Sequence, residues 1–436
     1  MGCVMKRYPK YKESGVDWIG KIPEHWETLR IKRAVQLRNE RRNDLPEGWP
    51  YIGLEDVESE SGKYAPTQNA SRQSDDSMVG VFRTGDVLYG KLRPYLRKAI
   101  VAAQDGVCST EFLVLSEGRA AASWVQRWLL TPEVTQEIEA GCDGAKMPRA
   151  DWEHVGSIPM PLPAVAEQIA ISSVLDRATA RIDTLIEKKA RFVELLKEKR
   201  QALIAHVVTK GLDPNVNIKD SGVEWIGRVP EHWYVKRLKY MLTSPLKYGA
   251  NEAAELDDPD MPRFVRITDI DENDSLRNET FKSLPAAVAR EYLLREGDLL
   301  FARSGATAGK TFLYRSNWGV CAYAGYLIRA RLDFNVVHPE FVRYFTASAS
   351  YWQWLSAVFI QATIQNVSAE KYANLVITQP ALVEQRAIVS FLNRETHKID
   401  LLARKVQRSI AILKERRAAL ITAAVTGQID LREEAA

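Results

Sequence analysis

The sequence has few cysteines, no long apolar run and little net charge, and each shortage excludes a class of protein. Its four cysteines lie far apart, without a Cys-x-x-Cys pair or histidines at ligand spacing, which argues against a zinc site and a disulfide framework and favours a reducing compartment. No apolar run approaches the roughly 18 to 20 residues that span a bilayer, and the N-terminus lacks the apolar core of a signal peptide. We therefore expect a soluble cytoplasmic protein.

Motifs of catalysis are also scarce. The sequence contains no glycine-rich cofactor loop after a strand, no Asn/Asp-Pro-Pro-Tyr/Phe motif and no convincing cluster of nuclease carboxylates. The segment 304–311 approximates a phosphate-binding P-loop, but Ser304 stands where the first glycine is needed. The matching segment of the first half, 89–95, abandons the pattern. A P-loop-like nucleotide hydrolase that binds ATP through Lys310 is therefore only an alternative hypothesis.

What the sequence does contain is one unit written twice. SGVDWIGKIPEHW in the first half returns as SGVEWIGRVPEHW in the second, with only conservative exchanges. Small insertions separate later landmarks, and the last part of each unit aligns without a gap. The matched segments are 14–26 with 221–233, 85–88 with 297–300, 106–108 with 319–321, and 167–213 with 384–430. Because single cores stop growing near roughly 250 to 300 residues, a chain of 436 residues predicts several domains.

The first part of each copy predicts a small, largely β domain, which we call a head. Short runs rich in Val, Ile, Tyr and Phe alternate there with Gly, Pro, Asn and Asp turns. Helical patches at 124–130 and 339–345 make the fold class α+β. The predicted strands are 50–54, 86–89, 112–115, 263–267, 298–301 and 326–330. The heads share landmarks but differ in content, and variable content on a fixed frame is typical of a recognition module.

The last part of each copy predicts one long helix with a seven-residue apolar repeat. No Gly or Pro interrupts either helix before Gly211 and Gly427, and roughly 45 residues at 1.5 Å each span about 65 to 70 Å. Such a helix is too long to bury inside a small domain, so we expect the two to pair as an antiparallel coiled coil with pseudo-two-fold symmetry. The expected pairing residues are Leu175, Ile182, Leu196, Leu203, Leu392, Ile399, Val406, Leu413 and Leu420, with Leu185, Ile186, Phe192, Val193, Leu402 and Ile410 widening the stripes.

These patterns divide the chain into four parts. The predicted domains are head 1 at 1–163, a spacer helix at 164–213, head 2 at 214–380 and a second spacer helix at 381–436. Trp18, Trp26, Trp225 and Trp233 occupy matched positions in the two heads, and identity between otherwise divergent units favours shared packing over base stacking. We expect His25 and His232 to be structural with them.

The loop that follows the Gly-Asp strand is basic in both copies, which makes it a candidate contact to nucleic acid. The formal net charge is only +4, so a phosphate-binding surface has to come from local clustering. Basic side chains attract phosphates, Arg can bind guanine edges, and Gln or Asn can bind adenine edges. The alternatives are a solvated basic loop and ordinary turn capping. The candidate DNA-binding residues are Lys91, Arg93, Tyr95, Arg97, Lys98, Lys146, Arg149, Arg303, Ser304, Lys310, Gln365 and Asn366.

A second basic stretch, from Arg30 to Arg42, has two interpretations. Its six basic residues can follow a nucleic-acid backbone, or they can form the solvated face of an amphipathic helix. The helix is the default expectation.

Taken together, the repeated motifs resemble the specificity subunit of type I restriction-modification systems. The resemblance rests on ESGVDWIGKIPEHW, the Gly-Asp-Leu-Leu strand with its basic loop, and Pro-x-x-x-Glu-Gln at the start of a long helix, each occurring twice, and it covers essentially the whole chain. It implies that each head is a target recognition domain for one half of an asymmetric, bipartite site in double-stranded DNA. Met147-Pro148-Arg149 departs from the usual polar stretch before the helix.

The resemblance also implies the partners and the absence of a catalytic centre. The helices would hold the heads apart and dock two methyltransferase subunits, and restriction subunits would join them. S-adenosylmethionine, ATP and Mg²⁺ would belong to those partners, with no cofactor on this chain. A coiled-coil scaffold without DNA binding is the remaining alternative, and it predicts no salt-dependent association with duplex DNA.

Overall fold

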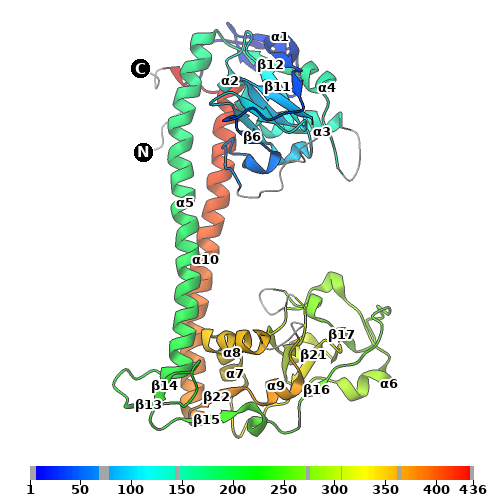
Figure 1. Cartoon of the computed structure of the whole chain (residues 1–436), viewed down its shortest axis with the longest axis vertical. Coiled ribbons are helices and arrows are strands. Elements are labelled where there is room, and N and C mark those ends of the chain that lie inside the picture. The colour runs from blue at the N-terminus through cyan, green and yellow to red at the C-terminus, as the bar shows by residue number, and fades with distance from the viewer. Residues whose placement is uncertain are drawn as a thin grey trace. The chain divides into compact units, whose positions relative to one another are not determined.

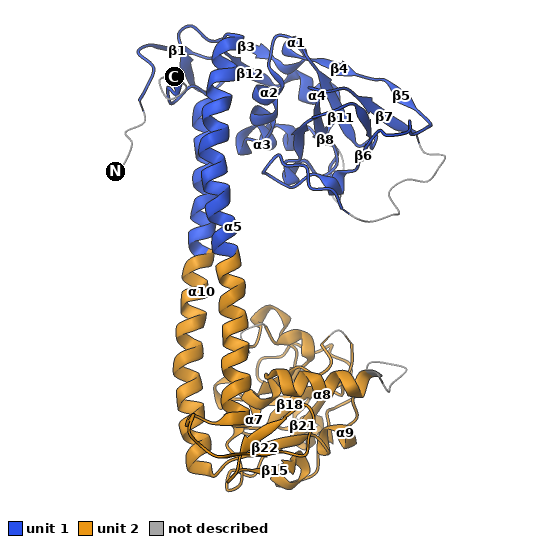
Figure 2. Cartoon of the chain, turned by 60° about the vertical axis from the view of Figure 1, so that its left-hand side comes forward, with its two compact units in different colours: residues 1–190, 408–436 blue, residues 191–407 orange. Residues whose placement is uncertain are grey.

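The computed structural model of the chain forms two compact units. Unit 1 comprises residues 1–190 and 408–436, and unit 2 comprises 191–407, so each unit holds one head and a portion of both long helices (Figure 2). The structure describes residues 6–67, 78–142, 147–271, 275–305, 307–360 and 366–432.

The head of unit 1 contains two four-stranded sheets. In one, β4 pairs with β11, β11 with β8 and β8 with β9, all antiparallel; in the other, the order β5-β7-β10-β6 ends in a parallel pair. The strands are β4 (Gln36–Arg38), β5 (Arg41–Arg42), β6 (Tyr51–Ile52), β7 (Val79–Phe82), β8 (Val87–Gly90), β9 (Ala99–Val101), β10 (Gly106–Cys108) and β11 (Phe112–Ser116). Around them lie β1 (Tyr11–Glu13), β2 (Lys21–Pro23), β3 (Glu27–Arg30), α1 (Ile31–Ala34), α2 (Ala122–Leu129), α3 (Pro132–Ala140), α4 (Trp152–Ser157) and β12 (Pro159–Leu162).

The head of unit 2 repeats this plan. Its four-stranded sheet has the order β16-β21-β18-β19, the counterpart of β4-β11-β8-β9, and β17 pairs in parallel with β20. The strands are β13 (Ile218–Asp220), β14 (Arg228–Pro230), β15 (Tyr234–Arg237), β16 (Lys247–Tyr248), β17 (Arg263–Val265), β18 (Leu299–Ala302), β19 (Thr311–Leu313), β20 (Cys321–Tyr323), β21 (Leu327–Ala330) and β22 (Val376–Gln379). The helices are α6 (Ala286–Ala289), α7 (Pro339–Thr346), α8 (Ala349–Ile360) and α9 (Ala369–Ala373).

These elements confirm the α+β fold class, and each predicted strand and short helix overlaps an observed one. The amphipathic helix expected over 30–42 is wrong. The helix α1 ends at Ala34, and the chain continues as β4 and β5, because these residues complete the edges of the two sheets. Hydrogen bonding to strands distant in the sequence therefore decided the conformation of these residues, against the helical pattern of the local sequence.

The strand that carries the Gly-Asp motif is buried on both faces in each head. Since side chains alternate along a strand, Val87 and Tyr89 of β8 enter one core while Leu88 enters another. In β18, Leu299 and Phe301 enter the first core while Leu300 and Ala302 enter the second. A strand buried on both faces has a continuous apolar sequence, which is why Val-Leu-Tyr and Leu-Leu-Phe follow the Gly-Asp pair.

The two long helices are α5 (Val165–Lys210) and α10 (Leu382–Val425), and each is followed by a glycine with positive φ. Gly211 (φ 76°) and Gly427 (φ 73°) adopt the left-handed conformation that ends a helix at little steric cost. In unit 1, the last part of α10 shares a core with the first part of α5 (Figure 1). In unit 2, the last part of α5 shares a core with the first part of α10. Each unit therefore pairs opposite ends of the two helices.

An ion pair between the helices recurs at equivalent positions of the repeat. Arg417 of α10 approaches Asp183 of α5 in unit 1, with Nε and Oδ1 2.9 Å apart. In unit 2, Arg200 of α5 approaches Asp400 of α10, and the same two atoms are 3.0 Å apart. In each unit the arginine comes from the later part of one helix and the aspartate from the earlier part of the other. The pseudo-two-fold coiled coil along the full length of the helices stays a prediction.

The buried stripe on each long helix is narrower than the sequence predicted. Of the nine expected pairing residues, Leu175, Leu196, Leu392 and Val406 are buried and the other five are half-buried. Among the residues expected to widen the stripes, Leu185, Phe192 and Leu402 are exposed, with 41–43% of each accessible. Two helices that pair with each other cover only a narrow seam, so positions beside it stay open. The expectation of widened stripes is wrong at these three residues.

Candidate nucleic-acid interface

The repeated Pro-Glu-His-Trp motif forms a fixed contact with the start of each long helix. The buried Trp26 donates its indole N–H to Glu167 Oε1 at 3.2 Å, and His25 Nε2 lies 2.9 Å from Oε2 of the same carboxylate. In unit 2, Trp233 donates to Glu384 Oε1 at 3.0 Å. His232 Nε2 lies 3.1 Å from Glu384 Oε2 in the same way. These contacts confirm the expected structural role of Trp26, Trp233, His25 and His232, and they explain why the motif is copied.

The glutamine that follows each of these glutamates fixes the head to the same helix end. Gln168 Oε1 accepts the backbone N–H of Ala121 at 2.7 Å, just before α2, and its amide donates to Pro163 O at 2.8 Å. Gln385 makes the equivalent bonds to His338, just before α7, at 2.7 Å and to Pro380 at 2.8 Å. Both glutamines are fully buried. The repeated residues thus form the frame that orients a head, and sequence variation has to be carried elsewhere.

The Gly-Asp motif is also part of this frame. Asp86 is buried and accepts from Arg38 Nε at 2.7 Å and from the backbone N–H of Arg83 at 2.8 Å. The hydrogen bond to Asp86 raises the pKa of Arg38 above its ordinary value. Asp298 accepts from Arg331 Nη2 at 2.7 Å and from a backbone N–H. Arg38, a member of the basic stretch 30–42, is therefore engaged inside the head.

The structure joins the two candidate segments that the sequence presented separately. After β8, Leu92 forms a β-bridge with Arg149, and Arg93 N donates to Pro148 O at 2.9 Å. After β18, Ser304 forms a β-bridge with Asn366. These bridges occupy equivalent positions in the two copies. We call the described parts of the joined segments surface 1 (91–98 with 147–149) and surface 2 (303–305 and 307–310 with Asn366).

On surface 1, part of the positive charge is already used within the head. Lys98 Nζ donates to Leu54 O at 2.7 Å, and burial lowers the pKa of Lys98. Arg97 pairs with Glu60. Arg93 is exposed in a left-handed conformation (φ 53°), and Tyr95 is 45% exposed. Arg93 and Tyr95 are therefore better placed than Arg97 and Lys98 to meet a ligand.

The remaining cations of surface 1 are held close together. Arg149 Nη2 lies 2.7 Å from Glu111 Oε1. Burial lowers the pKa of Lys91, and Glu111 opposes that shift. Lys91 and Arg149 both line a cavity of about 390 Å³ that Phe112 and Trp152 also border. Lys146, the other candidate in this loop, lies outside the described residues.

Surface 2 presents an arginine supported by an aromatic ring. The Arg303 guanidinium lies 4.9 Å from the centre of the Tyr248 ring, and its Nε donates to Asn366 Oδ1 at 3.4 Å. Lys310 is exposed, and Gln365 lies outside the described residues. Tyr248 was not among the predicted site residues, because it belongs to a strand of two residues with no spacing relation to the Gly-Asp loop.

The loop of surface 2 does not have the geometry of a P-loop. A P-loop connects a strand to a helix whose N-terminus faces the phosphates. Here Lys310 is followed by β19, which pairs antiparallel with β18, and Ala302 N donates to Lys310 O at 2.9 Å. The segment is a β-hairpin connection, so the nucleotide-hydrolase alternative is wrong in its structural premise.

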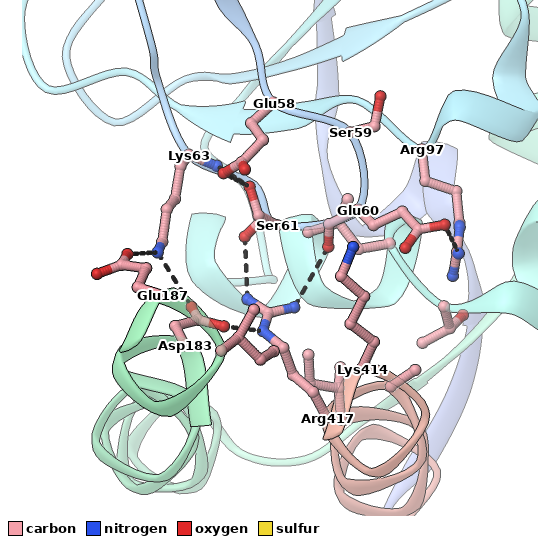
Figure 3. A pocket seen from close by; sticks show the side chains of 15 residues that line it. Glu58, Ser59, Glu60, Ser61, Lys63, Arg97, Asp183, Glu187, Lys414 and Arg417 are labelled. Atoms are coloured by element: carbon pink, nitrogen blue, oxygen red, sulfur yellow. Dashed lines mark hydrogen bonds and ion pairs between the residues drawn. The ribbon is translucent and has the colours of Figure 1, made fainter. Parts of the chain in front are cut away.

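A cluster of charged residues in unit 1 joins a loop of the head to the long helices. Figure 3 shows Arg417 between Asp183 and the carbonyl oxygens of Glu60 and Ser61, to which it donates at 3.3 and 3.1 Å. Lys63 Nζ lies 3.2 Å from Asp183 Oδ2. These contacts connect the loop 58–63 of the head to both long helices. The charges of the cluster are largely neutralised by one another.

The described residues form neither a metal-binding cluster nor a helix that could span a membrane. No group of three or more His, Cys, Asp or Glu side chains is placed to hold a metal ion in the described part of the chain. No described helix combines the length and the hydropathy needed to cross a membrane.

Comparison with known proteins identifies the relatives of the chain. No protein-family model matches it. It is 27% identical over 171 residues to the type I restriction enzyme EcoDI specificity subunit of Escherichia coli, an alignment that covers 38% of either protein. The alignment to the EcoBI specificity subunit of the same species covers 58% of that protein at 23% identity. The StySPI specificity subunit of Salmonella potsdam is 23% identical over 434 residues, which cover 94% of this chain and 90% of the relative.

Solved structures share the fold. A chain from a study of complex assembly and conformational transition of the type I R-M system superposes with a TM-score of 0.71 at 20% identity, covering 93% of this chain and 98% of that one. The HsdS subunit from Thermoanaerobacter tengcongensis gives a TM-score of 0.51 at 19% identity, covering 96% of this chain and all of the other. The resemblance drawn from the repeated motifs is confirmed: the curated relatives of this chain are type I restriction enzyme specificity subunits, and its fold is similar to that of a solved HsdS subunit.

Proposed function

We propose that this chain is the DNA sequence-specificity subunit of a type I restriction-modification complex and has no catalytic centre of its own. The observation that carries the proposal is the equivalent placement of two unlike surfaces. Surface 1 and surface 2 are built at the same position of the repeat, on frames whose Trp–Glu and Gln contacts match. Two different reading surfaces on one duplicated frame suit a site made of two different halves.

The residues of both surfaces suit duplex DNA. Exposed Arg93 and Lys310 supply attraction to phosphates, which does not depend on sequence. Arg303 and Asn366 are side chains that can bind purine edges in the major groove. The relatives are specificity subunits, and this supports the proposal over a scaffold without DNA binding.

The partners follow from the same proposal. Two methyltransferase subunits would dock on the duplicated helical frame, one for each copy, and restriction subunits would join the complex. S-adenosylmethionine would act on the methyltransferase subunits, and ATP and Mg²⁺ on the restriction subunits. The exposed apolar residues of the helices, such as Phe192 and Leu402, supply area for such contacts.

A domain exchange tests this function. Residues 14–163 are replaced by the corresponding head of a relative, and modified bases are mapped in DNA from cells that carry the chain with its methyltransferase. One half of the recognised site should change, while the other half and the gap stay the same. The reciprocal exchange of 214–380 is the matched control and should change the opposite half. A change of both halves after either exchange contradicts the proposal.

A further inference from the structure

The side chain and the backbone of Arg303 are both held in fixed positions. The guanidinium stacks on Tyr248 at 4.9 Å, and Nε donates to Asn366 Oδ1 at 3.4 Å. The backbone N–H of Arg303 donates to Tyr326 O at 3.0 Å, and its carbonyl accepts from Val367 N at 2.8 Å. A long side chain that is oriented before binding loses less entropy when it meets a ligand.

The groups that hold Arg303 are anchored in turn. The Tyr248 hydroxyl accepts the backbone N–H of Ala369, the first residue of α9, at 3.0 Å. Asn366 is bridged through its backbone to Ser304. Tyr248 is nevertheless 39% exposed and Arg303 is half-buried, so the support leaves the site open to a ligand.

The positive charge of Arg303 is not neutralised within the described part of the chain. No carboxylate there forms an ion pair with it, and its two terminal nitrogens have no hydrogen-bond partner among the described residues. Other arginines of the two heads differ in this respect. Arg315 Nη2 lies 2.6 Å from Glu340 Oε1, and on surface 1 Arg149 is paired with Glu111.

We infer that Arg303 reads a guanine in the half-site contacted by head 2, with Tyr248 and Asn366 as positioning residues. Guanine presents O6 and N7 side by side in the major groove, and the two terminal N–H groups of an oriented guanidinium match this pair of acceptors. A contact to phosphate needs no such orientation, and the exposed Lys310 can supply it. The inference rests on the proposed function and deepens it.

The test uses the full chain in complex with its methyltransferase. A library of duplexes randomised over the recognised site is methylated, and the methylated molecules are sequenced. Arg303→Ala should reduce the preference for one guanine by about 5- to 150-fold and leave all other positions unchanged. Arg303→Lys keeps the charge but replaces the planar pair of terminal N–H groups with a single ammonium, so it should weaken the same preference less than Arg303→Ala does, while overall binding to duplex DNA is retained.

Substitutions of the positioning residue and a matched control sharpen the test. Tyr248→Phe keeps the ring and loses only the hydrogen bond from Ala369, so it should keep most of the preference. Tyr248→Leu removes the stack and should weaken the preference at the same base much further. Arg237→Ala is the control, because Arg237 Nη1 donates to Asn374 Oδ1 at the same 3.4 Å as Arg303 does to Asn366 but stacks on no described ring. It should leave the recognised site unchanged.

Two negative outcomes have different meanings. If the wild-type complex recognises no bipartite site, the proposed function itself fails. If it recognises one, the inference is overturned when the half-site of head 2 contains no guanine, or when Arg303→Ala and Arg303→Lys weaken all sequences equally.

Discussion

Removing the Arg417 side chain should destabilise unit 1 by about 3 kcal/mol, near the lower end of the cost of breaking a buried ion pair. Arg417 and Asp183 expose only 14% and 15% of their side chains, so the pair is largely shielded from water. Arg417→Ala would also leave two carbonyl oxygens, of Glu60 and Ser61, without their donor. Lys63 stays near Asp183 and limits the loss.

The repeat supplies a matched control for this substitution. Arg200 and Asp400 form the equivalent pair in unit 2, but they expose 33% and 41% of their side chains, and Arg200 borders an open cleft of about 710 Å³. Arg200→Ala makes the same change at the equivalent helix position, so the change in helix propensity should be closely similar. An exposed pair contributes about 0 to 1 kcal/mol, and we expect a loss in that range.

Hydrogen exchange measured by mass spectrometry in the full chain distinguishes the two sites. Peptides from 58–63, 174–190 and 410–425 should lose protection in Arg417→Ala, while peptides of unit 2 stay protected. The double variant Arg417→Ala with Asp183→Ala should cost less than the sum of the single variants, since the two residues are coupled. Equal losses in Arg417→Ala and Arg200→Ala would refute the reasoning, because burial would then have no influence.

Three further predictions concern single residues. Lys310→Ala should weaken binding to all duplexes by a similar factor and lower the slope of log K against log salt by about one, which a salt titration measures; a selective loss at one base would contradict a phosphate contact. Burial lowers the pKa of His338 below its usual 6.5, so the stability that its neutral form contributes is present above about pH 6.5 and is lost as pH falls through the lowered pKa. His338→Asn should remove this part of the pH dependence of unfolding, and identical profiles would refute it. Burial raises the pKa of Cys108 to about 12, so at about pH 8 iodoacetamide should modify it only after unfolding; modification of the native chain would show that the thiol is accessible.

The sequence predicted the elements whose signal is local. The apolar runs after Gly85-Asp86 and Gly297-Asp298 gave the central strands, and the seven-residue spacing gave both long helices, because side chains only a few residues apart share one face of an element. The same local logic failed for residues 30–42, where pairing with distant strands decided the conformation.

The candidate site was predicted only in part. The sequence indicated the basic loops and the segments before the helices, but it gave no reason to connect them. It also ranked Arg97 and Lys98 equally with Arg93, although the first two are engaged inside the head. Whether a basic side chain is bound within the head or stays available to a ligand depends on groups far away in the chain, such as Glu60 and Leu54.

By itself, the sequence determined that the chain is a duplicated frame carrying two unlike heads, because repetition and periodicity are written along the chain. Only the tertiary structure decided which residues of that frame face one another. It placed Glu167 against Trp26, joined the loop after β18 to Asn366, and set Tyr248 beneath Arg303. These contacts depend on the order of strands in a sheet and on the packing of a head against a helix, which no spacing in the sequence expresses.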